Sequence, residues 1–450
     1  MKFFFSSMFN FIKKSIFILT FVSIIFLPIH ALFSQTYEDA YKPFWYLKDA
    51  GAKSASLAYN NTAISRGIDG LISNPALLGE VTNFQGQFSL VTDQFNQDAR
   101  LGSSDNSFNN ETSQLSSLDD IGLVYPVPVY RGSFVLGISY TNRAIYNYLS
   151  KSSGWQYESD PEYRYYLEED IIEEGRLNSL NLGGAIEVEK GLFLGLSFHL
   201  YNGFRDFKFT GIDEDRDDLY YYDRFNLNKN IETDYFGWNF SLGTLYKGES
   251  FKWGVKLATP LKLKATENST IDTTMYWDDG VKFDTSLVFK DLEYKTAFPT
   301  KISSGLSFNI NQFVVSLDIA INNWNDIDFD SDLEDAAGVS ADKRIKDNIS
   351  QYLARSTDYG FGLMIPITQR GQINLGYRSI GKPIEELSGE YERLLLYGLG
   401  FDYQVNQNMF LNLSYQLATG NNNQSHYFYT DKEENYRNHR LTLSTGIIFN

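Results

Sequence analysis

Cysteine is absent from this sequence of 450 residues, and histidine occurs only four times. The chain therefore has no disulfide framework, no thiol nucleophile and no cysteine to carry a lipid anchor. The four histidines, His30, His199, His426 and His439, are far apart, and we expect His199 to be a hydrogen-bonded wall residue. A multi-histidine zinc site or a Ser–His–Asp arrangement is not indicated. We predict no catalytic residue, no metal and no cofactor, and expect that the protein is not an enzyme.

Basic residues are in the minority, with 39 Lys and Arg against 56 Asp and Glu and a formal net charge of −17. A nucleic-acid partner is not expected, because binding of phosphates needs clustered cations. No glycine-rich phosphate-binding loop occurs, so neither a nucleotide nor an energy source is implied. Acidic residues gather at 168–170 and 213–215. We interpret these clusters as solvated loop faces, with a divalent-cation site as the alternative.

Long apolar runs are missing except near the N-terminus. Lysines precede an apolar run at 15–27, and small residues follow at Ala31 and Ser34. This pattern predicts a secretory signal peptide over 1–34. A membrane-anchoring helix is the weaker alternative, because the run is short of the roughly 20 residues that span a bilayer. No later run qualifies, so the inner membrane is not the expected destination.

Aromatic residues are abundant, at 16% of the chain with 35 Phe and 31 Tyr. The mean hydropathy is nevertheless −0.31, which is unlike that of a helical membrane protein. A transmembrane β-barrel has this composition, because only every second residue of a strand faces lipid and aromatic girdles lie at both membrane interfaces. The alternative is a soluble, tyrosine-rich secreted sandwich.

From residue 83 onward, apolar and polar residues alternate in segments of about ten, the length of a tilted membrane-spanning strand. Every odd-to-even connection is long and every even-to-odd connection is short, such as 189–191 and 405–407. A sandwich has no reason to sort its loops in this way, whereas an outer-membrane barrel requires it. We predict an all-β fold, a 14-stranded antiparallel transmembrane β-barrel over 83–450, in the outer membrane with both chain ends in the periplasm. The segments lie near 84–91, 119–126, 133–142, 180–188, 192–204, 235–247, 251–259, 299–309, 312–322, 357–366, 371–379, 394–404, 409–418 and 440–449.

The region at 35–82 lacks this alternation. It carries small residues, helix-compatible stretches and Asn74-Pro75-Ala76 as a turn or helix start. It is too short for an independent domain without a disulfide or metal. We predict an N-terminal plug that folds against the inner wall of the barrel.

These residues resemble the FadL/TodX family of outer-membrane transporters of hydrophobic compounds. The stretch from Gly51 and Ala52 to Ala58, followed by Asn74-Pro75-Ala76, is similar to that family's plug signature, with Lys53 where the family usually has arginine. Further likenesses are Ala258-Thr259-Pro260 at a strand exit, Pro299-Thr300-Lys301 at a strand entry, Asp318 with a following Trp324, and Gly376-Tyr377-Arg378. The resemblance covers most of the chain after the signal peptide.

The resemblance implies passive transport of a hydrophobic or amphipathic small molecule, similar to a long-chain fatty acid, past outer-membrane lipid and lipopolysaccharide. Parity places four cations on the lumen face as candidates for its head group: Lys252, Lys256, Lys301 and Arg378. A mutual salt-bridge network with Asp318 and Asp402 is the other reading. Aromatic stretches at 163–167 and 219–222 suggest a capture surface or, equally, loop packing. If the family mechanism holds, the plug shifts when ligand binds.

A second function stays open, because a similar barrel can act as a protein-interaction module, like the PorV-type shuttle of type IX secretion, which holds protein cargo. A continuous apolar tunnel favours the transporter, and a sealed barrel with a platform for a protein favours the interaction module. The plug argues against a general-diffusion porin.

Overall fold

The computed structural model describes residues 37–45, 47–64, 67–102, 106–157, 164–331, 341–384, 393–424 and 431–449. The signal peptide predicted over 1–34 lies outside them. No helix among the described residues is long and apolar enough to cross a membrane.

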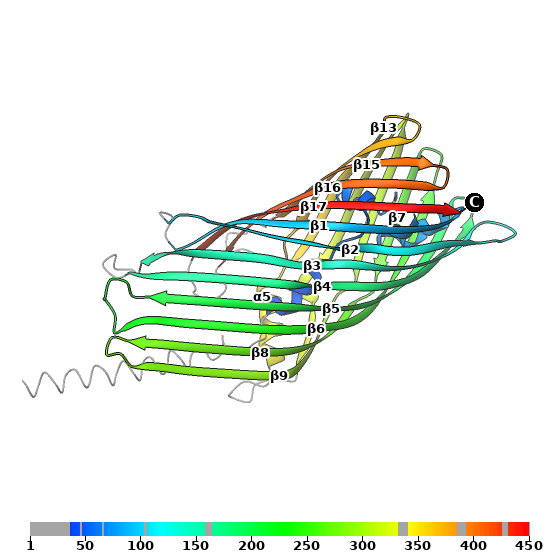
Figure 1. The fold of residues 1–450 in the computed structure, drawn as a ribbon. Helices are drawn as coiled ribbons and strands as arrows, with labels where there is room; N and C mark the ends of the chain where they lie inside the picture. Colours follow the sequence, from blue (N-terminus) through cyan, green and yellow to red (C-terminus); the bar gives the residue numbers. More distant parts are fainter. Residues whose placement is uncertain are drawn as a thin grey trace, which may run out of the picture.

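One antiparallel sheet makes up most of the molecule, and it closes on itself because β1 pairs with both β2 and β17 (Figure 1). The strands are β1 (Phe84–Leu101), β2 (Asn109–Val127), β3 (Phe134–Tyr157), β4 (Arg164–Glu189), β5 (Leu192–Glu214), β6 (Tyr222–Lys247), β7 (Phe251–Ala258), β8 (Leu261–Trp277), β9 (Lys282–Phe298), β10 (Lys301–Ile310), β11 (Phe313–Asn323), β12 (Asp328–Ser331), β13 (Arg355–Pro366), β14 (Gly371–Gly381), β15 (Arg393–Asn406), β16 (Met409–Gln424) and β17 (Asp431–Phe449).

Three wall strands are each interrupted once, so these segments make 14 barrel strands. Thr259 and Pro260 separate β7 from β8, and Pro299 and Thr300 separate β9 from β10. The 3₁₀ turn η4 (Trp324–Asp326) separates β11 from β12. The first two breaks lie side by side, since β7 pairs with β10 and β8 with β9. Proline has no amide hydrogen for the sheet, which explains these two interruptions. The predicted 14-stranded antiparallel closed barrel is confirmed.

Alternation along the strands sorts residues between the two faces of the wall, as predicted. On β16, Leu411 and Leu413 are exposed on the outside, whereas Asn412 and Ser414 are buried inside. Neighbouring Leu443 on β17 pairs with Leu413 on the same face. The short connections gather at one end of the barrel, the turn end, and the outward apolar side chains lie in the half nearest to it.

Several strands continue far beyond the predicted segments toward the opposite end, the loop end. The segment predicted at 180–188 is observed as β4 over Arg164–Glu189, and the one at 235–247 as β6 over Tyr222–Lys247. Here polar residues such as Glu174, Glu232 and Lys264 stand among the exposed ones, so the apolar signal of a lipid-facing strand is weaker. Sequence alternation therefore marked only the lipid-facing half.

The acidic cluster at 168–170 lies in a strand, so its assignment to a loop was wrong, although Glu168 and Asp170 are accessible to solvent. It belongs to β4, and the Glu169 carboxylate is fully buried 2.6 Å from the Lys432 ammonium of β17. The cation offsets the cost of burying the carboxylate, which a single stretch of sequence cannot reveal. The aromatic residues at 164–167 are likewise in β4 rather than in a loop.

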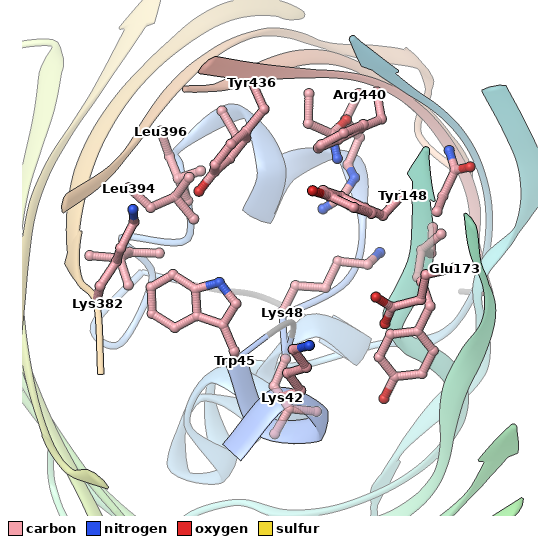
Figure 2. A pocket seen from close by; sticks show the side chains of 18 of the residues that line it. Lys42, Trp45, Lys48, Tyr148, Glu173, Lys382, Leu394, Leu396, Tyr436 and Arg440 are labelled. Atoms are coloured by element: carbon pink, nitrogen blue, oxygen red, sulfur yellow. The ribbon is translucent and has the colours of Figure 1, made fainter. Parts of the chain in front are cut away.

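The N-terminal segment lies inside the ring of strands, as predicted for a plug (Figure 2). Its elements are α2 (Tyr37–Trp45), α3 (Ala52–Ser56), η2 (Gly67–Asp69), α4 (Gly70–Ser73) and η3 (Pro75–Glu80). The remaining helix, α5 (Ala341–Tyr352), contacts η4, β12 and α2.

The largest apolar cluster joins α2 and α5 to the interrupted strands. Trp324 is its centre, with its ring centroid 4.8 Å from that of Phe298 and 5.9 Å from that of Trp45. Ile345 and Ile349 of α5 pack into the same cluster. This core therefore fixes α2 to the interrupted strands of the wall.

Candidate functional site in the plugged lumen

A ring of inward-facing glycines surrounds the plug. A Cβ atom on Gly376 of β14 would overlap the backbone of Leu57 and Ala58, and one on Gly243 of β6 would overlap Asn74. Close approach of the plug backbone thus requires glycine at these wall positions. The same holds for Gly195, Gly254 and Gly398 on three further strands, and a Cβ atom on Gly360 of β13 would overlap the Asn60 side chain.

Two asparagines tie the plug to the backbone of the wall. The Asn74 side chain donates to the carbonyl oxygens of Thr62 and Thr244 at 2.9 and 3.0 Å, and its oxygen accepts from Ala76 N at 3.1 Å. Asn60 donates to the carbonyl of Tyr377 at 2.8 Å. Asn74 is also the N-cap of η3, with Pro75 at the first position of the turn. The Asn-Pro-Ala motif thus shapes the plug and fastens it.

The plug also fills a split in the wall. β2 pairs with β3 only from Asp120 and Thr141 toward the turn end, and each strand has a bulged residue there, Asp119 on β2 and Arg143 on β3. Lys48 N donates to the Arg143 carbonyl at 2.8 Å, and the Lys48 ammonium lies 2.5 Å from the Asp119 carboxylate. Bulges redirect side chains at such sites. Both bulges thus hold Lys48 where the two strands part.

Gly51 is one of two plug glycines, with Gly67, whose positive φ favours glycine. Its φ is +86°, and a Cβ atom would lie 2.6 Å from Asp69 Oδ1. Gly51 N donates to Asp119 at 2.8 Å, and Ala52 N donates to Ser444 at 2.8 Å. The start of the predicted plug signature therefore contacts both β2 and β17.

An outer cavity of about 250 Å³ lies between the plug and the loop end (Figure 2). Trp45 from the N-terminal segment faces Tyr148, Tyr436, Leu394 and Leu396 from the wall across this space. Such a concave, aromatic and aliphatic lining suits a small apolar group.

Several charged groups at the outer cavity are paired. Arg440 lies 2.5 Å from Asp93, and Glu434 accepts from the Tyr148 hydroxyl at 2.8 Å. Glu173 lies 2.7 Å from Arg205. Lys42 and Lys382 also line the cavity, so its mainly apolar surface has both paired groups and lysines at the edge.

An inner cavity of about 160 Å³ adjoins it, and Trp45, Lys48 and Tyr59 line both. Its charged lining consists of five cations and two carboxylates: Lys48, Arg143, Lys256, Lys301, Arg378, Asp49 and Asp358. This excess of positive charge suits an anionic group.

Three of the four predicted head-group residues meet at the inner cavity. Arg378 and Lys301 lie 3.4 and 3.9 Å from Asp358, and Arg378 also donates to Tyr59 O at 2.8 Å. Lys256 donates to the Ile72 carbonyl and has no carboxylate within ion-pair distance among the described residues. Lys252 lies elsewhere, 2.6 Å from Glu80 at the turn end.

The two lumen carboxylates considered in the sequence also contact the plug. Asp318 accepts from Thr62 N at 2.9 Å, and Asp402 lies 3.3 Å from Lys53. They fasten the plug instead of pairing with the cavity cations. His199 is a buried wall residue, within 2.7 Å of Asn181 Oδ1, in agreement with the sequence interpretation.

Sequence reasoning missed Lys48, Arg143, Trp45 and Arg440, which line the cavities. Arg143 stands at a bulge, where alternation fails and parity gives no face. Arg440 sits at the limit of the last predicted strand. Lys48 and Trp45 belong to the plug, for which no strand parity exists; the run of aromatic residues at 44–46 was the available signal.

Solved structures similar to this chain include FadL-type channels. A Pseudomonas aeruginosa FadL homologue matches with a TM-score of 0.60 and 11% identity, over 90% of this chain and 100% of that chain. The P. putida toluene transporter TodX matches with a TM-score of 0.57 and 15% identity, over 90% and 99%. The Ralstonia pickettii toluene transporter TbuX gives 0.58 and 12%, over 90% and 100%. The resemblance to FadL/TodX seen in the sequence is confirmed, and at these identities it establishes the fold.

A comparison with curated proteins gave no match. A family model described as BamG matches residues 62–350, which is more than half of the chain and runs from the plug to α5. The fold of this chain is a barrel of the FadL type with the N-terminal segment in its lumen. By the match of the family model, the chain belongs to the BamG family.

Proposed function

We propose that the protein acts as an interaction module of the outer membrane, a barrel closed by its own plug that holds a partner protein at the membrane surface. The observation that carries this proposal is the ring of wall glycines in contact with the plug backbone. Displacing the plug would break these contacts on at least six strands together. These contacts favour a sealed lumen over a continuous tunnel, and a sealed lumen favours the interaction module over the transporter.

The loop end supports the same proposal. β4, β6 and β8 extend far toward the loop end (Figure 1). Their exposed residues include Glu174, Glu232 and Lys264. A polar outer face is unsuited to lipid and suited to water or protein. In the proposed orientation, with the turn end in the periplasm, these strands form a raised platform outside the cell.

Mass spectrometry of the protein extracted from its own membrane in mild detergent tests this proposal. We expect one stoichiometric protein companion and no retained amphiphile. Recovery of a single chain with a bound amphiphile and no companion would contradict the proposal. A soluble barrel-free protein from the same extract serves as the control for nonspecific association.

Passive transport of a hydrophobic or amphipathic small molecule is the second candidate, and the cation-rich inner cavity favours it. Two of the channels with this fold are named as toluene transporters. Under this proposal the outer cavity holds the apolar part of the ligand, and Lys256, Lys301 and Arg378 hold an anionic head group. The Lys48 segment between β2 and β3 would then be the part that moves.

Binding of a long-chain fatty acid, followed by the fluorescence of Trp45 and its neighbours, tests this candidate. We expect Lys256→Gln and Arg378→Gln each to weaken binding about tenfold, because a hydrogen bond to a charged group contributes about 1.5–3 kcal/mol. Lys264→Gln is the matched control, since Lys264 forms an exposed ion pair with Glu293 at 2.6 Å outside the cavities. Equal affinity in all variants would contradict the head-group assignment.

A further inference from the structure

A row of polar side chains crosses the inner face of the wall beside the inner cavity. Asn181 of β4 pairs with His199 of β5 in the register of the sheet, and Ser241 of β6 stands diagonally across from His199. His199 Nδ1 lies 2.7 Å from Asn181 Oδ1, and His199 Nε2 lies 3.1 Å from Ser241 Oγ. All three side chains are buried. The fold thus joins a hydroxyl, an imidazole and an amide from three strands.

The hydrogen bonds of Asn181 determine which nitrogen of the imidazole carries a hydrogen. Asn181 Nδ2 donates to the Ser179 carbonyl at 3.2 Å and to Ser139 Oγ at 3.1 Å, so the Asn181 oxygen is the atom that faces His199. An amide oxygen only accepts, and the neutral imidazole therefore has its hydrogen on Nδ1. The lone pair of Nε2 is then directed at the serine hydroxyl. In this arrangement a histidine can act as the general base for a nucleophilic serine.

Two serines lie at nearly equal distances from His199 Nε2, and they differ in their access to the cavity. Ser197 Oγ is 3.0 Å from this nitrogen, and Ser241 Oγ is 3.1 Å from it. Among the described residues, Ser241 lines the inner cavity together with His199, whereas Ser197 is fully buried and lines neither cavity. A molecule in the inner cavity can therefore contact Ser241 but not Ser197.

The inner cavity also supplies hydrogen-bond donors for a developing negative charge. Lys256 of β7 stands diagonally across from Ser241 on the inward face, two residues from the pairing partner Ala258. Diagonal neighbours in a sheet are within reach of a long side chain. The Lys256 ammonium donates to the Ile72 carbonyl and has further N–H groups, and Arg143 lines the same cavity. Preformed donors of this kind stabilise the oxyanion of an acyl-transfer intermediate.

We propose that Ser241, His199 and Asn181 form an acyl-hydrolase site, which cleaves small carboxylic esters that enter from the outer cavity. This assignment goes beyond the proposed function and needs no partner protein, and it differs from the expectation that the protein is not an enzyme. The apolar lining of the outer cavity suits the hydrocarbon part of such an ester, and the cations of the inner cavity suit a carboxylate product. Trp45 and Tyr59 line both cavities, so one molecule can extend from the first into the second.

The reaction has two steps, and His199 carries one proton in each. In the first step, Ser241 Oγ attacks the ester carbonyl and gives its proton to His199 Nε2, the bond to the alcohol oxygen breaks, and the alcohol leaves with that proton. In the second step, water attacks the acyl-serine and gives a proton to Nε2, which returns it to Ser241 Oγ as the carboxylic acid departs. Ester and water are consumed, and alcohol and acid are formed. Asn181 is a positioning residue, because it orients the imidazole without touching the ester.

Labelling of the folded protein in mild detergent with diisopropyl fluorophosphate, located by peptide mass spectrometry, tests the inference. We expect a single label on Ser241, because this probe reacts with activated serines. Hydrolysis of p-nitrophenyl butyrate is the second readout. Ser241→Ala should abolish both labelling and hydrolysis. Ser197→Ala is the matched control, since Ser197 lies at nearly the same distance from the same nitrogen, and it should keep both.

Variants of the base and of the positioning residue separate catalysis from wall packing. His199→Gln should lower the labelling rate about a hundredfold or more, the usual contribution of a general base. Asn181→Leu should lower it as well, and Asn181→Asp, which keeps an acceptor for the Nδ1 hydrogen, should restore it. Each rate is compared on protein whose β5 amides exchange hydrogen like those of the wild type. Equal labelling rates in the wild type and His199→Gln would overturn the inference.

A folded wild-type protein that shows neither label nor hydrolysis also overturns the inference. A label on Ser197, or hydrolysis that persists in Ser241→Ala, does the same. None of these outcomes bears on the interaction module, because a protein companion should remain with the Ser241→Ala variant whether or not the wild type cleaves esters.

Discussion

Single wall residues decide how firmly the plug is held. Gly376 is the clearest case, because a Cβ atom there would overlap plug backbone instead of the end of a flexible side chain. We expect Gly376→Ala to destabilise the closed plug by about 1–3 kcal/mol, the usual cost of overpacking. Hydrogen exchange over residues 52–64 measures the effect.

Gly70→Ala is the matched control for that variant. A Cβ atom on Gly70 has its nearest neighbours at 3.5 Å, which is ordinary van der Waals contact. The plug amides of the Gly70→Ala variant should exchange hydrogen at the wild-type rate. A Gly376→Ala plug that is equally protected would show that the wall yields and that the glycine ring does not fasten the plug.

Glu80 makes the attachment of the plug dependent on pH. Burial alone would raise the pKa of Glu80, but the ammonium groups of Lys252 and Lys247, at 2.6 and 3.0 Å, outweigh it and lower this pKa. A carboxylate with a lowered pKa stabilises the folded state above its unfolded pKa of about 4.3, and this contribution disappears as the pH falls through the folded value.

We therefore expect Glu80→Gln to weaken the plug at pH 7 by about 2 kcal/mol, and this effect to diminish as the pH falls through the lowered pKa of Glu80. Hydrogen exchange of η3, corrected for intrinsic rates at each pH, measures the difference. Glu293→Gln, which breaks only the exposed pair with Lys264, should change nothing at any pH in the series. An effect of Glu80→Gln that does not diminish on acidification would contradict the ion pairs as its cause.

At the scale of elements, Trp324 joins α2 and α5 to the interrupted strands of the wall. The side chain is 4% exposed, and its Nε1 donates to Ser356 Oγ at 2.8 Å. We expect Trp324→Ala to cost about 3–5 kcal/mol through the cavity that it leaves. The substitution should also release α2 from the wall, and limited proteolysis would detect this release as cleavage within 37–45.

Trp324→Phe separates packing from hydrogen bonding at the same site. It keeps an aromatic ring against Phe298 and loses the bond to Ser356, so we expect a cost of about 1 kcal/mol. Resistance of α2 to protease in the alanine variant would mean that Arg205, which lies 3.4 Å from Asp39, anchors the helix by itself.

At the scale of the whole molecule, the plug determines whether the barrel is sealed or forms an open pore. A barrel of 14 strands is wider than the eight-stranded barrels that side chains fill, and narrower than the porins of 16 strands or more. In planar bilayers we expect no steady ion conductance from the intact protein and a stable conductance from a variant lacking residues 36–80. Steady conductance by the intact protein would contradict a sealed lumen.

The lipid-facing half of the barrel could be predicted from sequence because its physics is local. Alternation over about ten residues, as at 409–418, reports which residues face lipid, and strand ends follow from connector length. The plug was also predictable, since Gly51 and Asn74-Pro75-Ala76 act through their own backbone geometry. Lys256, Lys301 and Arg378 were placed on the correct face by the same parity.

The sequence by itself therefore determined strand number, wall faces and the presence of a plug. Only the tertiary structure decided where strands continue beyond lipid, and that Lys252 pairs with Glu80 while Lys256 reaches the inner cavity. These features depend on residues far apart in the chain, such as Glu169 and Lys432. A local pattern records the solvent that a residue meets, whereas a partner across the barrel leaves no periodic trace in the sequence.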